Sequence, residues 1–466
     1  MKKKFLSLIL ATAMIGTMLI GCGNSDSGSD NKDSGDDGKG AEESSDAGEI
    51  KVASVNNDAM VIMEELSKKY TEETGTKVTF TILSENEIRS KITQDVGLGG
   101  GEYDLVTLGT SDMGTYLDNG WTEALDPMFD ALSDEEKSEY DLDDVFQSVR
   151  TSCSSETKGL AALPFYSEST MICYNKEIFE EKKLTMPENP TWEDIYDLAS
   201  KCDDKANGVA GIAIRGLAGY GENMYIFGSI MNAFGGQYYD MDWNATYDTP
   251  EVKEAWEFYN KLLTVAEDSP TTCGYTECLN LFAQGKAAIY YDATVSAGTF
   301  AKDDSAVKGK VGYAPAPTAK KENTGTIGGW GIGITAGSKN KDAAFDFLRW
   351  ATSKEYVKLV QEEKGFPSTP SGTRVSTYEN QEYLDACDFA ATTRIAIETA
   401  DAIHPAIEDT PYTGNSLPNL PEYSSWGETL AAELASYVSG QKDLDACLAD
   451  CQSAIDSAAE EGGYRD

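Results

Sequence analysis

Histidine is almost absent from this chain: His404 is the only one among 466 residues. The nine cysteines contain no Cys-x-x-Cys pair, so the ligand spacing typical of zinc sites is missing and we expect neither a metal nor a cofactor. A Ser-His-Asp hydrolase would have to use His404, which precedes Pro405 and has no nucleophile elbow near it. These absences disfavour metal-dependent and triad-type enzymes.

Positive charge is also scarce. The chain has 38 Lys and Arg against 79 Asp and Glu, which gives a formal net charge of −41. Such a charge is repelled by phosphate backbones and by anionic lipid, so we expect no nucleic-acid partner and no body lying on a membrane surface. It suits an exported domain that handles a neutral or cationic ligand.

The one long apolar run lies at the start of the chain. Lys2, Lys3 and Lys4 precede the largely apolar segment Phe5–Ile20, and Gly21-Cys22 ends it. A positive start, a short apolar stretch and a polar continuation are typical of a secretory signal peptide, here residues 1–21. The Leu-x-Gly-Cys ending resembles the bacterial lipobox, which implies cleavage before Cys22, acylation of that cysteine and anchoring to the outer face of the cell membrane. An uncleaved anchor or an unlipidated export signal is the alternative.

Residues 22–48 contain Gly, Ser, Asp, Glu and Asn without a large apolar side chain. Such a segment buries too little surface to offset its ordering entropy, so we expect a disordered tether. The folded part then begins near Glu49, and its more than 400 residues are enough for two or three domain-sized cores.

From Glu49 onward, strand and helix patterns alternate. Strands are predicted at Ile50–Val55, Lys77–Leu83 and Tyr103–Leu108, with helices between them. This βαβαβ order predicts an α/β fold with a parallel sheet, and ligands of such sheets bind at the carboxyl ends of the strands. Asn57 and Asp112 follow strand ends and become candidate ligand contacts, with helix capping as the alternative role for both.

The segment 159–179 carries four polar residues, Ser167 to Thr170, between two apolar strand-like runs. A carboxylate is rarely buried without partners, so these residues are not typical of a core. We interpret the segment as the passage from one lobe of a two-lobed protein to the other, with Glu168 facing the cleft. A surface turn with a solvated Glu168 is the alternative.

Further candidates lie in a glycine-rich loop and at strand ends. The loop 215–223 contains Arg215 and Tyr220 and can wrap a polar ligand; it is not a P-loop, because it lacks Gly-Lys-Ser/Thr. Asp292 follows the predicted strand 287–291. Trp330 is flanked by glycines, which leave its ring accessible, although alternation places it on one face with Ile332 and Ile334 and a core role is the alternative.

The segment 240–251 places acidic and polar residues at calcium-loop spacing. Position six of that pattern is Ala245, where the sharp turn needs glycine, so a solvated acidic hairpin is the favoured interpretation.

Taken together, several landmarks make the chain resemble the family 1 extracellular solute-binding proteins, the sugar-capturing components of ABC importers. They are Pro164…Glu168…Tyr174-Asn175-Lys176-x-x-Phe179, Pro190-Thr191-Trp192, Phe234-Gly235-Gly236, Phe282-x-x-Gly285-Lys286-Ala287-Ala288, Ala316-Pro317 and Ser338-Lys339-Asn340. The resemblance implies two α/β lobes that close by hinge motion around a ligand, with ABC permease subunits as partners. It places the N-terminal lobe at 49–163 plus 311–352 and the C-terminal lobe at 164–310 plus 353–466.

Within that family, the chain is most similar to the sorbitol/mannitol (polyol) binders. The matching residues are Arg215-Gly216…Gly219-Tyr220-Gly221-Glu222-Asn223-Met224, Asp292-Ala293-Thr294 and Gly372-Thr373-Arg374-x-Ser376-Thr377-Tyr378. Gly328-Gly329 depart from the bulkier residues of polyol binders, so a monosaccharide or short oligosaccharide stays open as the ligand.

The resemblance and the chemistry of hydroxyl-rich ligands together assign roles. Glu168 and Asp292 are expected to accept hydrogen bonds from hydroxyls, and Arg215 is expected to donate them. Trp330 and Tyr220 are expected to cover C–H edges. The expected secondary contacts are Asn57, Asp112 and Arg374.

We expect a non-enzymatic monomer that reaches the membrane only through its lipid anchor. Two alternatives remain at this point: a surface glycoside hydrolase, which needs a suitably spaced pair of carboxylates, and a binding receptor that feeds a sensor kinase.

Overall fold

The computed structural model describes residues 48–155 and 157–465 of the chain. The predicted signal peptide, Cys22 and the tether up to residue 47 lie outside the described residues. No helix within the described ranges combines the length and the apolar character that a membrane crossing requires. All eight cysteines of this part carry free thiols.

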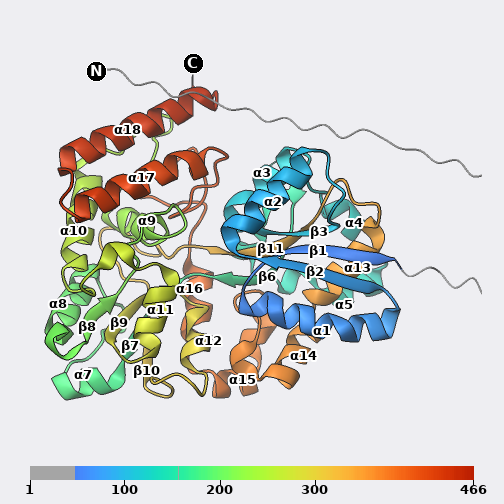
Figure 1. Cartoon of the computed structure of the whole chain (residues 1–466), viewed down its shortest axis with the longest axis horizontal. Coiled ribbons are helices and arrows are strands. Elements are labelled where there is room, and N and C mark those ends of the chain that lie inside the picture. Colours follow the sequence, from blue (N-terminus) through green and yellow to red (C-terminus); the bar gives the residue numbers. More distant parts are fainter. Residues whose placement is uncertain (1–47, 156, 466) are drawn as a thin grey trace, which may run out of the picture. The chain divides into compact units, whose positions relative to one another are not determined.

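The first sheet has five strands in the order β2-β1-β3-β11-β6. Strands β1, β2 and β3 are parallel, whereas β11 runs antiparallel to both β3 and β6. Their bounds are β1 Glu49–Val55, β2 Lys77–Leu83, β3 Leu105–Gly109, β6 Leu163–Glu168 and β11 Gly328–Ile334. Figure 1 shows α1 (Asp58–Thr74) on one face of this sheet and α2 (Glu85–Gly97) with α3 (Thr110–Asp118) on the other. The predicted βαβαβ unit is therefore present.

Local signals explain the boundaries of the first helix. Asn57 accepts a hydrogen bond from the Met60 backbone N–H at 2.9 Å, which caps α1, and Gly75 ends the helix in the left-handed conformation. The apolar stripe of Met60, Met63 and Leu66 then packs into the core.

The second sheet has four strands in the order β10-β7-β9-β8. Strand β7 is antiparallel to its neighbours β10 and β9, and β8 is parallel to β9. The bounds are β7 Thr170–Asn175, β8 Ala210–Ala213, β9 Ala287–Ala293 and β10 Val311–Pro315. Ser169 alone separates β6 of the first sheet from β7 of the second, so the chain passes between the sheets where the sequence predicted it.

Helices pack around the second sheet. Among them, α8 (Trp192–Cys202) and α11 (Tyr275–Ala283) pack on β8 and β9, whereas α9 (Asn223–Phe234) contacts α10 (Pro250–Leu263). The C-terminal helices α17 (Tyr423–Val438) and α18 (Leu444–Glu461) pack on each other, as Figure 1 shows.

The strand pairing corrects the expected lobe boundaries in two places. Strand β10 forms a five-residue ladder with β7, so the chain at 311 belongs to the second sheet and not to the first. Strand β6 pairs with β11 in the first sheet, although the second lobe was expected to start at 164. In both cases the hydrogen-bonding partner comes from a distant part of the sequence, which local patterns do not specify.

A third correction concerns the segment after 353. Helix α14 (Lys354–Lys364) packs on α13 (Lys341–Ala351), and α13 contacts α1, β11 and β6 of the first sheet. The chain therefore stays on the first-sheet side beyond the expected boundary, because Tyr356 and Val360 of α14 are buried there.

Candidate functional site

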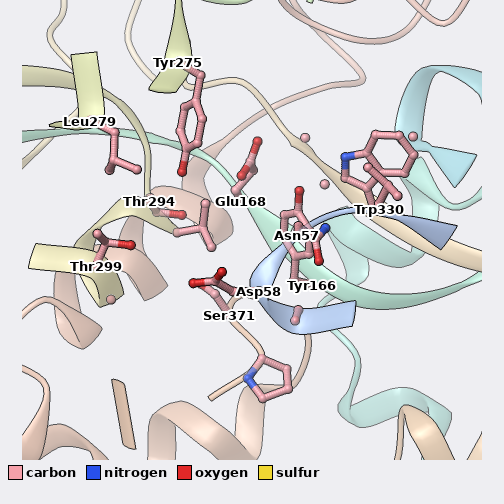
Figure 2. A pocket seen from close by; sticks show the side chains of 18 of the residues that line it. Asn57, Asp58, Tyr166, Glu168, Tyr275, Leu279, Thr294, Thr299, Trp330 and Ser371 are labelled. Atoms are coloured by element: carbon pink, nitrogen blue, oxygen red, sulfur yellow. The ribbon is translucent and has the colours of Figure 1, made fainter. Parts of the chain in front are cut away.

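A cavity of about 640 Å³ is lined by strand residues of the first sheet and by segments that follow strands of the second sheet, such as Arg215 after β8 and Thr294 after β9. Its size falls in the range that small-molecule sites occupy, roughly 300–1,000 Å³. Asn57 follows β1, Glu168 ends β6, and Trp330 lies near the start of β11. Figure 2 shows these three side chains around the same space. This position, beyond the carboxyl ends of the parallel strands, matches the expectation from the fold.

Glu168 is partly exposed and lines the cavity. The Tyr225 hydroxyl donates a hydrogen bond to Glu168 Oε1 at 3.2 Å. Burial and the nearby Glu168 charge raise the pKa of Tyr225 well above its usual value, so this phenol remains a proton donor. In Figure 2 the Glu168 carboxylate lies near the Tyr275 ring. The predicted cleft-facing carboxylate is therefore present in the cavity wall.

Arg215 lines the cavity from the loop that follows β8. Its Nε and Nη2 donate to the two oxygens of Asp292 at 2.8 and 2.5 Å, and its Nη1 donates to the Gly221 carbonyl at 2.8 Å. The guanidinium carbon lies 4.6 Å from the Tyr225 ring centroid and 4.9 Å from that of Tyr275. Burial by itself would lower the pKa of Arg215. The charge and the hydrogen bonds of Asp292 outweigh this effect, so the pKa of Arg215 lies well above its usual value. Arg215 is a rigidly held, permanently charged donor.

Asp292 requires a correction. It was predicted to accept a ligand hydroxyl, but it is not among the cavity-lining residues and its exposed fraction is 0%. Both of its carboxylate oxygens bind Arg215, and Oδ1 also accepts from the Ala293 backbone N–H at 2.7 Å. A buried carboxylate needs such partners. Asp292 therefore lies behind the cavity wall and holds Arg215 in position.

Trp330 lines the cavity with 8% of its surface exposed, whereas Ile332 and Ile334 on the same strand face are fully buried. Both interpretations from the sequence therefore hold in part: the strand face enters the core, and its first side chain borders the cavity. Arg89 packs on the indole, with its guanidinium carbon 4.6 Å from the ring centroid. Gly329 has φ +128°, and a Cβ there would lie 2.6 Å from the Tyr166 carbonyl oxygen. The strand can approach its neighbour this closely only with glycine at that position.

Tyr220 and Asn57 also line the cavity, as predicted. The Tyr220 ring packs edge-on against Tyr423, with a centroid distance of 5.8 Å. Asn57 caps α1 through Oδ1, and its buried Nδ2 has no hydrogen-bond partner among the described residues. Asn57 therefore caps the helix and borders the cavity, and its role as a ligand contact stays a prediction.

Asp112 and Arg374 are corrections, since neither is among the lining residues. Asp112 forms an ion pair with Arg89, which lines the cavity, and so holds that side chain in position. Arg374 is 1% exposed and donates to the Thr352 carbonyl at 3.0 Å and to Asp144 Oδ2 at 3.2 Å. The Arg374 guanidinium therefore donates its hydrogen bonds to acceptors inside the protein and not to the cavity.

Several lining residues were missed by the sequence argument. The polar and aromatic ones include Tyr166, Tyr225, Tyr275, Thr294, Ser371 and Arg89. Tyr225 lies in the first turn of α9, directly after the glycine-rich loop that begins at Arg215. This position in the sequence is the one signal that could have predicted its contact with Arg215. The others come from elements whose packing only the tertiary structure reveals.

The segment Asp240–Glu251 shows no sign of a cation site. The Asp240 carboxylate accepts hydrogen bonds from the backbone N–H groups of Asp242 and Asn244, both at 2.9 Å. Nowhere in residues 48–155 and 157–465 do three or more His, Cys, Asp or Glu residues form a group that could hold a metal ion.

Comparison with known proteins gives consistent matches. Residues 53–358 match the model of the bacterial extracellular solute-binding protein family. The chain is 36% identical over 421 residues to a mannitol-binding protein of Pseudomonas aeruginosa, covering 89% of this chain and 94% of that protein.

Solved structures agree in fold. An ABC transporter solute-binding protein from Agrobacterium vitis with bound D-mannitol is 36% identical, with a TM-score of 0.83 over 90% of this chain and 99% of that one. A solute-binding protein of Agrobacterium radiobacter in complex with ribitol shares the fold at 24% identity, with a TM-score of 0.74 over 89% of this chain and 97% of that one. Together with the two-sheet architecture, these matches show that the chain belongs to the bacterial extracellular solute-binding protein family.

Proposed function

We propose that this protein captures a neutral sugar alcohol or small sugar in the cavity and delivers it unaltered to the permease of an ABC importer. The observation that carries the proposal is the placement of a carboxylate acceptor, Glu168, and a fixed guanidinium donor, Arg215, in one cavity wall with aromatic rings. The mannitol named for one relative and seen in one related structure supports the polyol class.

The chemistry of such a ligand fits these side chains. Each hydroxyl both donates and accepts, and hydrogen bonds to charged groups contribute roughly 1.5–3 kcal/mol each. Glu168 accepts, Arg215 donates, and the faces of Trp330 and Tyr220 cover C–H edges, with Asn57 as a secondary contact. A ligand that lacks one of the matched hydroxyls leaves a buried polar group unpaired at a cost of about 1–3 kcal/mol, which provides selectivity.

The direct test is a thermal-shift screen of hexitols, pentitols, hexoses and disaccharides, followed by calorimetric titration of the hits. A bound ligand raises the melting temperature by mass action. We expect a polyol or small sugar to do so and to be recovered chemically unchanged after prolonged incubation. Conversion of the ligand would support the alternative of a glycoside hydrolase, and a screen without hits would overturn the proposal.

We also propose that two lobes close around the ligand by hinge motion at the passages between the sheets, including Glu168–Thr170 and residues 316–327. Small-angle scattering of the monomeric protein, with and without a saturating ligand, tests this. A radius of gyration that does not decrease would contradict it.

Membership of the extracellular solute-binding protein family supports a location of the folded part outside the cytoplasm. We propose that Cys22 anchors it there through its lipid. Metabolic labelling with a fatty-acid analogue should mark the wild-type protein but not Cys22→Ala, whereas an unlabelled wild-type protein would contradict lipid anchoring at this residue. Loss of ligand uptake on deleting the permease separates import from a receptor that serves only a sensor kinase.

A further inference from the structure

Two tyrosine rings lie against the Arg215 guanidinium in the cavity wall. The guanidinium carbon lies 4.6 Å from the ring centroid of Tyr225 and 4.9 Å from that of Tyr275. The Tyr225 hydroxyl donates its proton to Glu168 Oε1 at 3.2 Å. The Tyr275 hydroxyl accepts a hydrogen bond from Ser296 Oγ at 3.3 Å, and its own proton has no acceptor within the part of the chain that the structure describes. The two phenols therefore differ in how they use their protons.

Behind Tyr275, a short chain of hydroxyls fixes the direction of these hydrogen bonds. Tyr290 and Ser296 are both 0% exposed, and the Tyr290 hydroxyl lies 2.8 Å from Ser296 Oγ. Ser296 has a single hydroxyl proton, so it can donate either to Tyr290 or to Tyr275. If it donated to Tyr290, the Tyr290 proton would be buried without an acceptor among the described residues, which is costly. Tyr290 therefore donates to Ser296, and Ser296 donates to Tyr275.

This order leaves the proton of the Tyr275 hydroxyl for the cavity. Figure 2 shows the phenol directed into the cavity beside Thr294 and Glu168. Burial raises the pKa of Tyr275 above its ordinary value, so the phenol stays protonated at neutral pH. The backbone N–H of Tyr275 donates to Glu222 Oε2 at 2.9 Å, so the residue is held at its backbone as well as at its hydroxyl. Tyr275 is therefore a prearranged donor in the cavity wall.

From this arrangement we propose that Tyr275 selects for a hydroxyl at one position of the ligand. Its phenol donates a hydrogen bond to the oxygen of that hydroxyl, and the buried residues Tyr290 and Ser296 keep the phenol proton turned toward the ligand. The inference rests on the proposed function and adds a specificity-determining residue to it. A ligand that carries hydrogen in place of this hydroxyl leaves the phenol proton without an acceptor, so the cavity discriminates against the corresponding deoxy compounds.

The first test removes the donor and keeps the ring, in Tyr275→Phe. Calorimetric titration with D-mannitol at neutral pH should show about tenfold weaker binding than in the wild type. Equal affinity of the two proteins would overturn the inference and leave the proposed function intact. A wild-type protein that does not bind mannitol would overturn the inference together with the polyol class on which it rests.

The matched control is Tyr239→Phe. The Tyr239 hydroxyl is buried and donates to the Ile455 carbonyl at 2.8 Å, outside the cavity wall, so this variant should keep the wild-type dissociation constant. Tenfold weaker binding in both variants would contradict a specific role of Tyr275. The double variant Tyr275→Phe/Tyr290→Phe also removes the proton that Tyr275→Phe leaves without an acceptor, and it should show the same loss of affinity if the single variant is too unstable to titrate.

A second comparison identifies the hydroxyl that Tyr275 contacts. D-mannitol is symmetric, so its hydroxyls are removed in pairs, and each dideoxy analogue lacks the terminal, the second or the central pair. The ratio of mannitol affinity to analogue affinity should fall about tenfold in Tyr275→Phe for one analogue and stay at the wild-type value for the other two. An equal change in all three ratios, or no change in any, would contradict a contact with one hydroxyl.

Fluorine tests the direction of the hydrogen bond, because a C–F group accepts a hydrogen bond weakly and cannot donate one. With fluorine at the identified positions, the difluoro analogue should bind the wild type at least about threefold more tightly than the dideoxy analogue. This difference should vanish in Tyr275→Phe. Equal binding of the two analogues to the wild type would overturn the assignment of Tyr275 as a donor.

Discussion

Arg215 and Asp292 form a buried two-point ion pair, with Nε to Oδ2 at 2.8 Å and Nη2 to Oδ1 at 2.5 Å. The two residues are 77 positions apart in the sequence. Arg215 forms part of the cavity wall, and Asp292, which lies behind that wall, compensates the charge of the guanidinium. In our proposal, Arg215 contacts the ligand and Asp292 holds Arg215 in place.

Replacing Asp292 with Ala should therefore weaken both folding and binding. Removing one partner of a buried ion pair leaves an uncompensated charge and costs about 3–5 kcal/mol. Urea unfolding without ligand should show this loss, and calorimetry should show weaker polyol binding. The exposed pair Lys253–Asp445 provides a control, since Lys253→Met should cost less than about 1 kcal/mol. Wild-type stability of Asp292→Ala would contradict the positioning role.

Trp330 is expected to contribute its ring face to ligand affinity. Trp330→Phe keeps an aromatic surface and should retain most of the affinity, whereas Trp330→Ala should weaken binding about tenfold, or roughly 1.4 kcal/mol. Isothermal titration measures both. Trp192 is buried away from the cavity wall, so Trp192→Phe should leave the dissociation constant unchanged. Full affinity in Trp330→Ala would remove the ring from the site.

Gly329 should not tolerate a side chain. Its φ of +128° and the 2.6 Å distance that a Cβ would have from the Tyr166 carbonyl oxygen make Gly329→Ala costly, by about 1–3 kcal/mol. Binding should weaken as well, because Trp330 is the next residue. The control Gly97→Ala places a Cβ with no neighbour within 4 Å and should leave stability nearly unchanged. Similar unfolding curves for the two variants would contradict this account.

Arg374 should matter for stability and not for ligand recognition. Its guanidinium is buried against Asp144 and the Thr352 carbonyl, and its carbon lies 4.7 Å from the Tyr140 ring centroid. Arg374→Met should lower the unfolding free energy by about 3–5 kcal/mol, since Asp144 loses a buried partner. At a temperature where the variant is folded, its polyol affinity should match that of the wild type. A selective loss of affinity would return Arg374 to the ligand site.

Asp144 should make the protein sensitive to acid. Burial by itself would raise the pKa of Asp144. Hydrogen bonds from Ser376 and Arg374 and the charge of Lys354 outweigh this effect, so the pKa of Asp144 lies below its usual value. The ionised group thus stabilises the fold above its unfolded pKa of about 3.9, and this contribution is lost as the pH falls through the lower folded value. Denaturant titrations below about pH 4 should show a shallower pH dependence for Asp144→Asn than for the wild type. Identical slopes would contradict the shift.

The amino-acid sequence determined the features that depend on neighbouring residues. Strand β2 has the bounds predicted from its pattern, and Asn57 caps α1, one of the two roles that its position after a strand suggested. Periodicity, caps and glycine stops act within a dozen residues, so they can be read without knowledge of the fold. Glu168 could be found for the same reason, because a carboxylate between two apolar strands is already unusual in the local sequence.

Only the tertiary structure decided which charged residue reaches the cavity. Asp292 and Glu168 are both acidic residues near strand ends, yet one lies against Arg215 inside the protein and the other in the cavity wall. Arg374 likewise meets Asp144, 230 positions away in the sequence. The free energy of a charge depends on burial and on its partner, and distant segments supply both when the sheets pack. The same long-range packing placed β10 beside β7, where no local pattern could have assigned it.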